Sequence, residues 1–246
     1  MADEKIGIKQ TIRLEWIEEA FQLVKQGLSD KEIRHKLKKI ISVQTGSGLS
    51  GERGSESTDQ VVNILVNIWL KSSSPTLPIR KELLNEENED RGSIVIRNWI
   101  MISVAYPFWN QTATIIGRLS GFQAQFTHHQ VIQRLKEQYG DRSTIERYGR
   151  YVIRSFKEWG IIVDTPNRGY YKLPEKVPVT THHLAALLLE CEMIAKQRAY
   201  ITFSEASAIP ALFAFSLADL TIDQIVRCSS RLNSNLQAYE QVINRE

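Results

Sequence analysis

The chain has 246 residues, of which 42% are hydrophobic and 24% are charged, and its formal net charge is +3. This composition excludes an intrinsically disordered protein, and the length suits one large domain or two to three small ones. The small positive charge permits nucleic-acid binding without requiring it, so an electrostatic binding surface would have to come from clustered cations.

The two cysteines, Cys191 and Cys228, lie far apart and form no CxxC or Cys/His cluster. This spacing predicts neither a disulfide framework nor a structural zinc site. We expect both thiols to be buried as small hydrophobic groups in a reduced, cytoplasmic protein. The first ten residues lack the apolar core of a signal peptide, and no segment approaches about 18 uninterrupted apolar residues, so no membrane partner is expected.

The N-terminal part predicts three helices. Residues 11–26 place apolar side chains about 3.6 residues apart, and Gly27 ends this amphipathic helix. Ser29 and Glu32 have the spacing of a capping box for a second helix through about Ile40. Its outer side carries Lys31, Arg34, Lys38 and Lys39.

The segment 44–59 is rich in glycine and serine and predicts a flexible loop without the sequence of a phosphate-binding loop. Ser57 or Thr58 can cap a third helix that ends at Trp69 or Lys71. The Lys71–Pro78 segment is polar, and the acidic run 85–90 is expected to be a solvated loop or a helix end.

We place a domain boundary near Arg91 and expect an N-terminal helical domain (1–90), a DNA-binding domain (91–176) and a C-terminal helical segment (177–246). The fold class predicted is mainly α, with helical bundle segments and a winged helix-turn-helix that carries one short β-hairpin. In the last segment, helices are expected at 179–197, at 203–220 with a kink at Pro210, at 221–228 and at 232–244.

The middle of the chain contains a helix-turn-helix pattern. After an apolar helix over 93–105, ended by Pro107, and a helical stretch over 112–120, Thr127 and Gln130 form a capping box for a helix through Tyr139. Ser143 and Glu146 repeat that spacing and open a helix over 144–159. Two capped helices joined by a short turn that contains glycine are typical of a helix-turn-helix.

The second of these helices has two opposite faces at about 100° per residue. Ile145, Tyr148, Gly149, Val152, Phe156 and Trp159 form the face expected in the core. Arg147, Arg150 and Arg154 lie opposite, with Ser143 and Tyr151 beside them. An α-helix fits the major groove, and arginine pairs well with phosphates and with guanine.

A β-hairpin is expected next, over 161–173, with its turn at 164–169 and Arg168 at the tip. Such a hairpin forms the wing of a winged helix-turn-helix, where Arg168 can reach an adjacent groove or phosphate. The predicted DNA-binding residues are therefore Arg142, Ser143, Arg147, Arg150, Tyr151, Arg154 and Arg168.

Two other interpretations of the middle segment remain. Its helices and hairpin can serve protein contacts. Its arginine face can also serve only solubility, with Glu146 or Glu158 paired to the arginines.

A second, weaker helix-turn-helix pattern lies near the N-terminus. Residues 20–37 resemble the opening of such a unit, but the helix that follows at 58–69 is apolar and carries no basic residue. That unit is expected to pack or dock rather than to read DNA.

No pattern predicts catalysis. The sequence holds no GxSxG, HExxH or dinucleotide-binding motif, and its carboxylates form no recognisable acid/base pair. The histidine pairs 128–129 and 182–183 cannot readily chelate one metal, because neighbours on a helix point about 100° apart. We expect a non-enzymatic protein without a metal or a cofactor.

Three stretches carry a resemblance to a known family: LEWIEEAFQLVKQGLSDKEIRHKL with the later RGSEST, then AYPFW, then THHQVIQRLKEQYGDRSTIERYGRYVIRSFKEWGIIVD. In these the chain resembles the BrxA family of the BREX bacteriophage-defence systems. The resemblance implies a small helical component that binds double-stranded DNA beside a methyltransferase, an ATPase and a phosphatase-like protein. Other phage-defence proteins are its implied partners. A protein–protein adaptor within a defence complex and a transcriptional regulator are the alternative functions.

Overall fold

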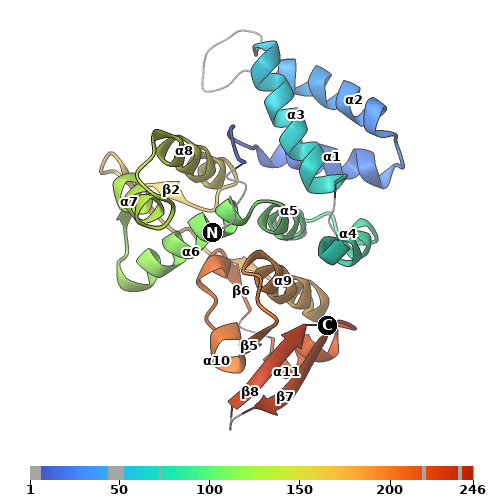
Figure 1. Ribbon diagram of the computed structural model, residues 1–246, viewed down its shortest axis with the longest axis vertical. Helices are drawn as coiled ribbons and strands as arrows, with labels where there is room; N and C mark the ends of the chain where they lie inside the picture. The colour runs from blue at the N-terminus through green and yellow to red at the C-terminus, as the bar shows by residue number, and fades with distance from the viewer. Residues whose placement is uncertain (1–6, 44–52, 72–73, 218–219, 238–239, 246) are drawn as a thin grey trace.

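The computed structural model describes residues 7–43, 53–71, 74–217, 220–237 and 240–245. Within these ranges the chain forms eleven α-helices, two 3-10 helices and eight short strands (Figure 1). The predicted mainly α fold class is thereby confirmed.

The N-terminal unit is formed by α1 (Leu14–Lys25), α2 (Asp30–Val43) and α3 (Ser55–Trp69), which pack on one another. The predicted capping box of α2 is present, because the Glu32 carboxylate accepts from the Ser29 backbone N–H at 2.9 Å and the Glu32 N–H donates to Ser29 Oγ at 3.4 Å.

The third helix begins earlier than predicted. Gly54 is the N-cap of α3, so the expectation that Ser57 or Thr58 caps this helix is wrong. Most of the predicted glycine- and serine-rich loop, residues 44–52, lies outside the described residues.

The segment before the central helix contains more structure than expected. A 3-10 helix, η1 (Ser74–Thr76), leads into α4 (Leu77–Leu84), where the sequence predicts a polar connection. Asp90, the last residue of the acidic run, is the N-cap of α5 (Arg91–Ala105) and accepts from Ser93 N–H at 3.0 Å. A carboxylate there satisfies backbone N–H groups that the first helical turn leaves unpaired.

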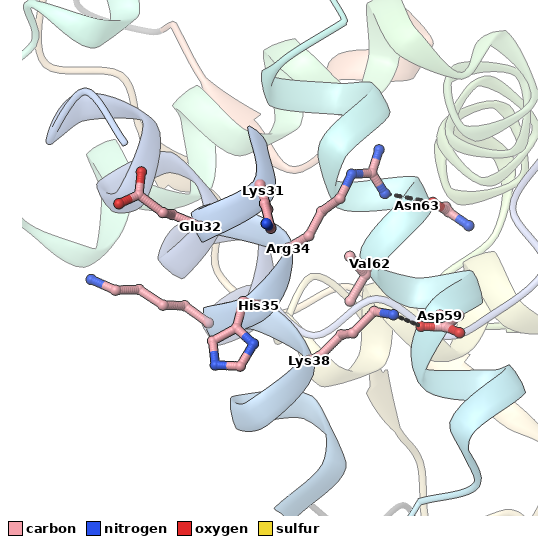
Figure 2. A pocket seen from close by; sticks show the side chains of 9 residues that line it. Lys31, Glu32, Arg34, His35, Lys38, Asp59, Val62 and Asn63 are labelled. Carbon is pink, nitrogen blue, oxygen red and sulfur yellow. Dashed lines mark hydrogen bonds and ion pairs between the residues drawn. The ribbon is translucent and has the colours of Figure 1, made fainter. Parts of the chain in front are cut away.

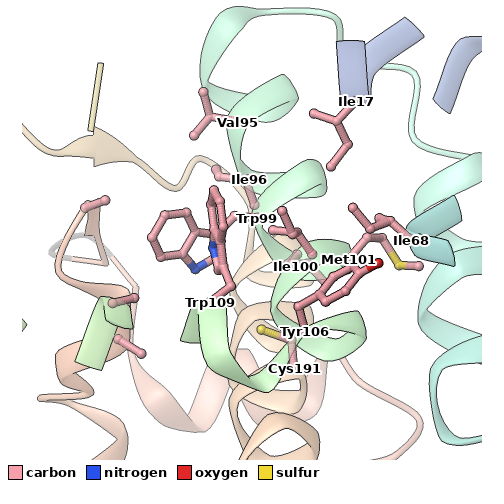
Figure 3. Close-up of a cluster of buried hydrophobic side chains, with 14 of the residues drawn as sticks. Ile17, Ile68, Val95, Ile96, Trp99, Ile100, Met101, Tyr106, Trp109 and Cys191 are labelled. Carbon is pink, nitrogen blue, oxygen red and sulfur yellow. The ribbon is translucent and has the colours of Figure 1, made fainter. Parts of the chain in front are cut away.

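Helix α5 lies at the centre of the molecule, in contact with α1, α3, α6 and α9 (Figure 1). Trp99 of α5 is fully buried and stacks on Phe156 of α8, with ring centroids 5.2 Å apart. It also meets Trp109 at 5.7 Å and Phe215 at 5.3 Å (Figure 3 shows the two tryptophans). One continuous hydrophobic core therefore contains residues from all three predicted segments.

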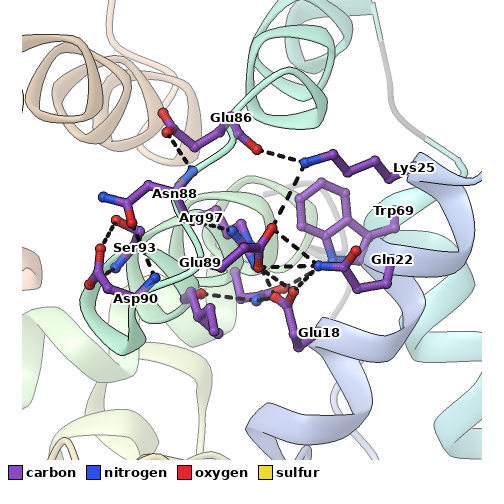
Figure 4. Close-up of polar contacts among 12 residues, drawn as sticks. Glu18, Gln22, Lys25, Trp69, Glu86, Asn88, Glu89, Asp90, Ser93 and Arg97 are labelled. Carbon is purple, nitrogen blue, oxygen red and sulfur yellow. Dashed lines mark hydrogen bonds and ion pairs between the residues drawn. The ribbon is translucent and has the colours of Figure 1, made fainter.

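A buried ion pair also fixes α5 to α1. Arg97 is fully buried, and its Nε donates to the Glu18 carboxylate at 3.0 Å. Its Nη2 donates to the Glu89 carboxylate at 2.7 Å (Figure 4). The acidic run 85–90 therefore supplies an ion-pair partner for Arg97 as well as the N-cap of α5. A buried guanidinium needs such partners, since an unpaired buried charge is strongly unfavourable.

The middle of the chain runs from α6 (Pro107–Phe122) through β1 (Phe126–Thr127), α7 (His128–Tyr139) and α8 (Ser143–Glu158). The predicted hairpin follows as β2 (Val163–Asp164) and β3 (Tyr170–Lys172). Strand β3 lies between β1 and β2 and is antiparallel to both. The hairpin therefore closes back onto the strand that precedes α7.

The C-terminal segment is less helical than predicted. Strand β4 (Val177–Pro178) pairs in parallel with β6 (Phe215–Ser216), and the expected helix α9 (His182–Ala195) is present. The predicted kinked helix at 203–220 is wrong, because this segment forms α10 (Phe203–Ala206), η2 (Pro210–Leu212) and β6.

A second hairpin replaces the last predicted helix. After α11 (Ile222–Arg227), β7 (Leu232–Gln237) and β8 (Glu240–Arg245) form an antiparallel sheet with β5 (Tyr200–Thr202). The expectations of a helix at 232–244 and of a single hairpin in the chain are therefore wrong. Leu232 and Leu236 have helical spacing, but Leu232 is the only buried side chain of β7.

The two cysteines differ in environment. Cys191 is buried in α9, whereas Cys228 is exposed, so the expectation of burial is wrong for Cys228. Burial and the neighbouring carboxylates Glu192 and Glu190 raise the pKa of the Cys191 thiol well above its usual value. Cys191 is therefore a packing residue rather than a reactive thiol.

Candidate nucleic-acid interface

The two helices of the predicted helix-turn-helix are joined by a three-residue turn. The capping box of α7 is complete, with Gln130 N–H bonded to Thr127 Oγ1 and the Gln130 side chain bonded to Thr127 N–H. Gly140 ends α7 with a φ of +90°, a conformation that side chains with a Cβ rarely adopt. The sequence signals for the end of α7 and for the turn are thus confirmed.

The capping box predicted for α8 is wrong. Helix α8 begins at Ser143 with Arg142 as its N-cap, and no side chain caps it. Glu146 instead forms ion pairs with Arg150, one turn along the same helix, and with Lys136 of α7 at 3.2 Å. The Glu146 carboxylate therefore points towards Lys136 of α7, across the turn, and not towards the backbone N–H groups at the start of α8.

A glycine sets the close approach of α8 to α7. A Cβ at Gly149 would lie 2.6 Å from Cδ1 of Ile132 and 2.9 Å from Cδ1 of Leu135. The predicted core face of α8 is buried at Ile145, Gly149, Val152, Phe156 and Trp159, while Tyr148 is half-buried.

The opposite face of α8 is cationic and exposed. Arg147, Arg150 and Arg154 all lie on it, and Tyr151 beside them is half-buried. Arg150 pairs with Glu146, whereas no acidic partner is found among the described residues for Arg147 or Arg154. Because an exposed ion pair contributes little free energy, a phosphate can replace Glu146 at low cost. Arg142 and Ser143, at the start of the helix, are exposed as well.

The hairpin presents the last predicted residue. Arg168 is exposed in its turn, and Gly169 beside it has a φ of +83°. Lys157 of α8 forms an ion pair with Asp164 at 2.5 Å, which ties the hairpin to the end of this helix. The structure thus brings six of the seven predicted residues to the start and outer face of α8 and places Arg168 on the attached hairpin.

His128 lies in the first turn of α7, and the charged side chains of α8 act on its imidazole electrostatically. Burial lowers the pKa of its imidazole, and the positive charge of Arg150 lowers it further. His128 is therefore more strongly held in its neutral form than an ordinary histidine.

Sequence reasoning missed a pair of arginines next to this face. Arg13 and Arg53 both lie against the ring of Trp16, at 5.1 Å and 5.2 Å from its centroid. Arg53 also interacts electrostatically with Tyr151 of α8. No local pattern could have indicated this, because the fold alone brings the three segments together.

A further basic surface lies on the N-terminal unit. A groove of about 740 Å³ lies between α2 and α3, and Figure 2 shows side chains that line it. Arg34 donates to Asn63 at 2.8 Å there, and Lys38 pairs with Asp59 at 2.7 Å. The outer side of α2 is thus basic as predicted, although carboxylates neutralise part of it.

The histidines of the C-terminal segment have protein partners. His182 bonds to Gln224 at 3.3 Å, and His183 lies 3.4 Å from Glu82. In the described part of the chain, no three His, Cys, Asp or Glu side chains form a group that could hold a metal ion. None of the helices in the described ranges is long and apolar enough to cross a membrane.

A scan against protein-family models, a search of curated proteins and a search of solved structures each returned no match to this chain. We therefore infer the function from the geometry above and from the resemblance of the sequence.

Proposed function

We propose that this protein is a non-enzymatic, cytoplasmic component of a BREX-like phage-defence system that binds double-stranded DNA through α8 and the β2–β3 hairpin. One observation carries the proposal: α8 buries one face in the core and presents three arginines on the other. Arg147, Arg150 and Arg154 lie within about 60° of one another on that exposed face, and a helix that enters the major groove needs cations and hydrogen-bond donors there.

The order of the elements supports this interpretation. Two helices joined by a three-residue turn, followed by a hairpin that pairs with a strand before them, match what we expect of a winged helix-turn-helix. In that interpretation α8 enters the major groove, and Arg168 contacts the neighbouring backbone. Phosphate contacts would supply most of the affinity. The defence role, with other defence proteins as partners, depends on the resemblance to the BrxA family.

The proposal is tested by the variant Arg147→Ala/Arg150→Ala/Arg154→Ala. These side chains lie opposite the core face, so the variant is expected to fold as the wild type does and to lose duplex binding. The matched control is Lys71→Ala/Lys81→Ala/Arg227→Ala, which removes three exposed charges away from α8. Fluorescence anisotropy with a labelled duplex measures binding, and circular dichroism checks folding.

Wild-type affinity in the folded α8 variant would contradict the proposal. The protein-adaptor function would then be favoured. Loss of binding in the control as well would show that net charge, rather than the α8 face, determines the affinity.

A further inference from the structure

The N-terminal segment is fixed alongside α8. The Ile12 N–H donates to Ser155 Oγ at 2.8 Å, and the Ile12 carbonyl accepts from Trp159 Nε1 at 2.9 Å. Both hydrogen bonds are buried. Because Ser155 follows Tyr151 by four residues, about one helical turn, this segment lies along the Tyr151 side of α8. The next residue, Arg13, is therefore held close to the cationic face.

Arg53 is held in the same place by three neutral groups. Its Nε donates to Ser57 Oγ at 3.0 Å, its Nη2 donates to Gln10 Oε1 at 2.8 Å, and its guanidinium lies 5.2 Å from the Trp16 ring centroid. These contacts restrict the rotamers of Arg53 and so reduce the entropy that an added hydrogen bond would cost. None of them neutralises its charge.

The charge of Arg53 is opposed by its surroundings. Burial lowers the pKa of its guanidinium, and the nearby Arg13 lowers it further. Two guanidiniums on one indole ring repel each other, and an anion between or beside them would relieve that repulsion. Arg53 interacts electrostatically with Tyr151 of α8, and the hydrogen bonds of Ile12 hold the preceding segment beside the same helix. The pair therefore lies on the side of α8 that borders the face of Arg147, Arg150 and Arg154.

We propose that Arg53, assisted by Arg13, is a phosphate contact that extends the DNA-binding face of α8 onto the N-terminal unit. The ligand is the phosphodiester backbone of the duplex that α8 engages, so the inference rests on the proposed function. Continuity with the α8 face favours a polyanion long enough to reach both sites. This contact does not contribute to sequence specificity, because a guanidinium pairs with a phosphate whatever the base.

Arg53→Gln tests the inference, because it removes the charge and keeps an amide N–H near the position of Nε, where it can still donate to Ser57. The plot of log K against log salt concentration is expected to lose about 0.9 of its slope, the amount for one phosphate contact on B-form DNA. Two unrelated duplexes should weaken alike, and the melting temperature should stay the same. Arg53→Lys should retain most of the slope. Lys81→Gln on α4 is the control and should change neither quantity.

Each remaining outcome decides between the two proposals. If Arg53→Gln keeps the wild-type slope, the inference is overturned, and loss of binding in the α8 variant would still uphold the proposed function. If an Arg13→Gln/Arg53→Gln variant loses binding while the α8 variant keeps it, the α8 assignment fails and Arg53 stands as a phosphate contact. If the wild-type protein binds no duplex, both the proposed function and the phosphate contact at Arg53 are overturned.

Discussion

Two glycines of α6 illustrate how a single residue sets the packing. A Cβ at Gly117 would lie 1.9 Å from the carbonyl oxygen of Pro210, so only glycine allows α6 to lie against η2. Gly121, one turn later, has nothing within 4 Å of its would-be Cβ. Neither glycine has a positive φ, so the two differ in packing rather than in backbone conformation.

We therefore predict opposite effects of the same substitution. Gly117→Ala should lower the free energy of unfolding by about 1–3 kcal/mol, as overpacking does. Gly121→Ala should be neutral or stabilise by up to about 1 kcal/mol, because alanine is the better helix former. Urea denaturation of both variants measures the difference. Equal stabilities would show that α6 and η2 are not in close contact.

Glu205 gives a prediction about pH. Ion pairing with Arg198, together with the bond from the Thr202 N–H, lowers the pKa of its carboxyl to about 2. Since the folded pKa lies below the ordinary value, Glu205 stabilises the fold above about pH 4.5 and loses that contribution as pH falls towards 2. An NMR titration should show this low midpoint, and Arg198→Met should raise it towards the ordinary value. A midpoint unaffected by Arg198→Met would contradict the ion pair.

At the scale of elements, α8 depends on its last core residue. Trp159 is 1% exposed, and its ring meets Trp109 at 5.1 Å. Its Nε1 donates to the Ile12 carbonyl, so it also fixes the N-terminal segment. Trp159→Ala should cost about 3–5 kcal/mol, as for other large aromatic truncations. Thermal unfolding measures the loss, and an unchanged melting temperature would mean that α8 does not pack as described.

Sequence patterns predicted the elements whose information is local. Helix α1 followed from apolar periodicity, and α2 and α7 followed from the capping boxes at Ser29 and Thr127, which are present in the structure. The capping box at Ser143 failed because its glutamate pairs with Lys136 across the turn, which spacing along the chain cannot reveal. The C-terminal hairpin was not predicted, because β7 has a single buried residue and therefore lacks the alternation of apolar and polar side chains that is typical of a strand.

The residues of the candidate site also fall into two groups, those that a local pattern predicts and those that only the fold brings together. The arginine face of α8 and the tip of the hairpin could be predicted, because one helix and one turn define them. Arg13 and Arg53 could not be predicted, because their position depends on how the segment at residues 10–13 packs along α8. Contacts between distant segments carry no signature in a single sequence.

At the scale of the whole molecule, α5 unites the N-terminal unit, the α6–α8 region and the C-terminal segment. Its Trp99 contacts aromatic side chains of α6, α8 and the segment after α9. Because one hydrophobic core contains described residues of all three parts, the N-terminal unit packs against the rest of the molecule. A duplex on α8 would therefore also meet the N-terminal unit.

The most direct test of DNA binding is a titration of the wild-type protein with two unrelated duplexes at two salt concentrations. Phosphate contacts from α8, Arg168 and Arg53 predict similar affinities for both duplexes and a steep loss of affinity at the higher salt concentration. Absence of binding to either duplex, or an affinity that salt leaves unchanged, would contradict the claim that this protein holds DNA through its arginines.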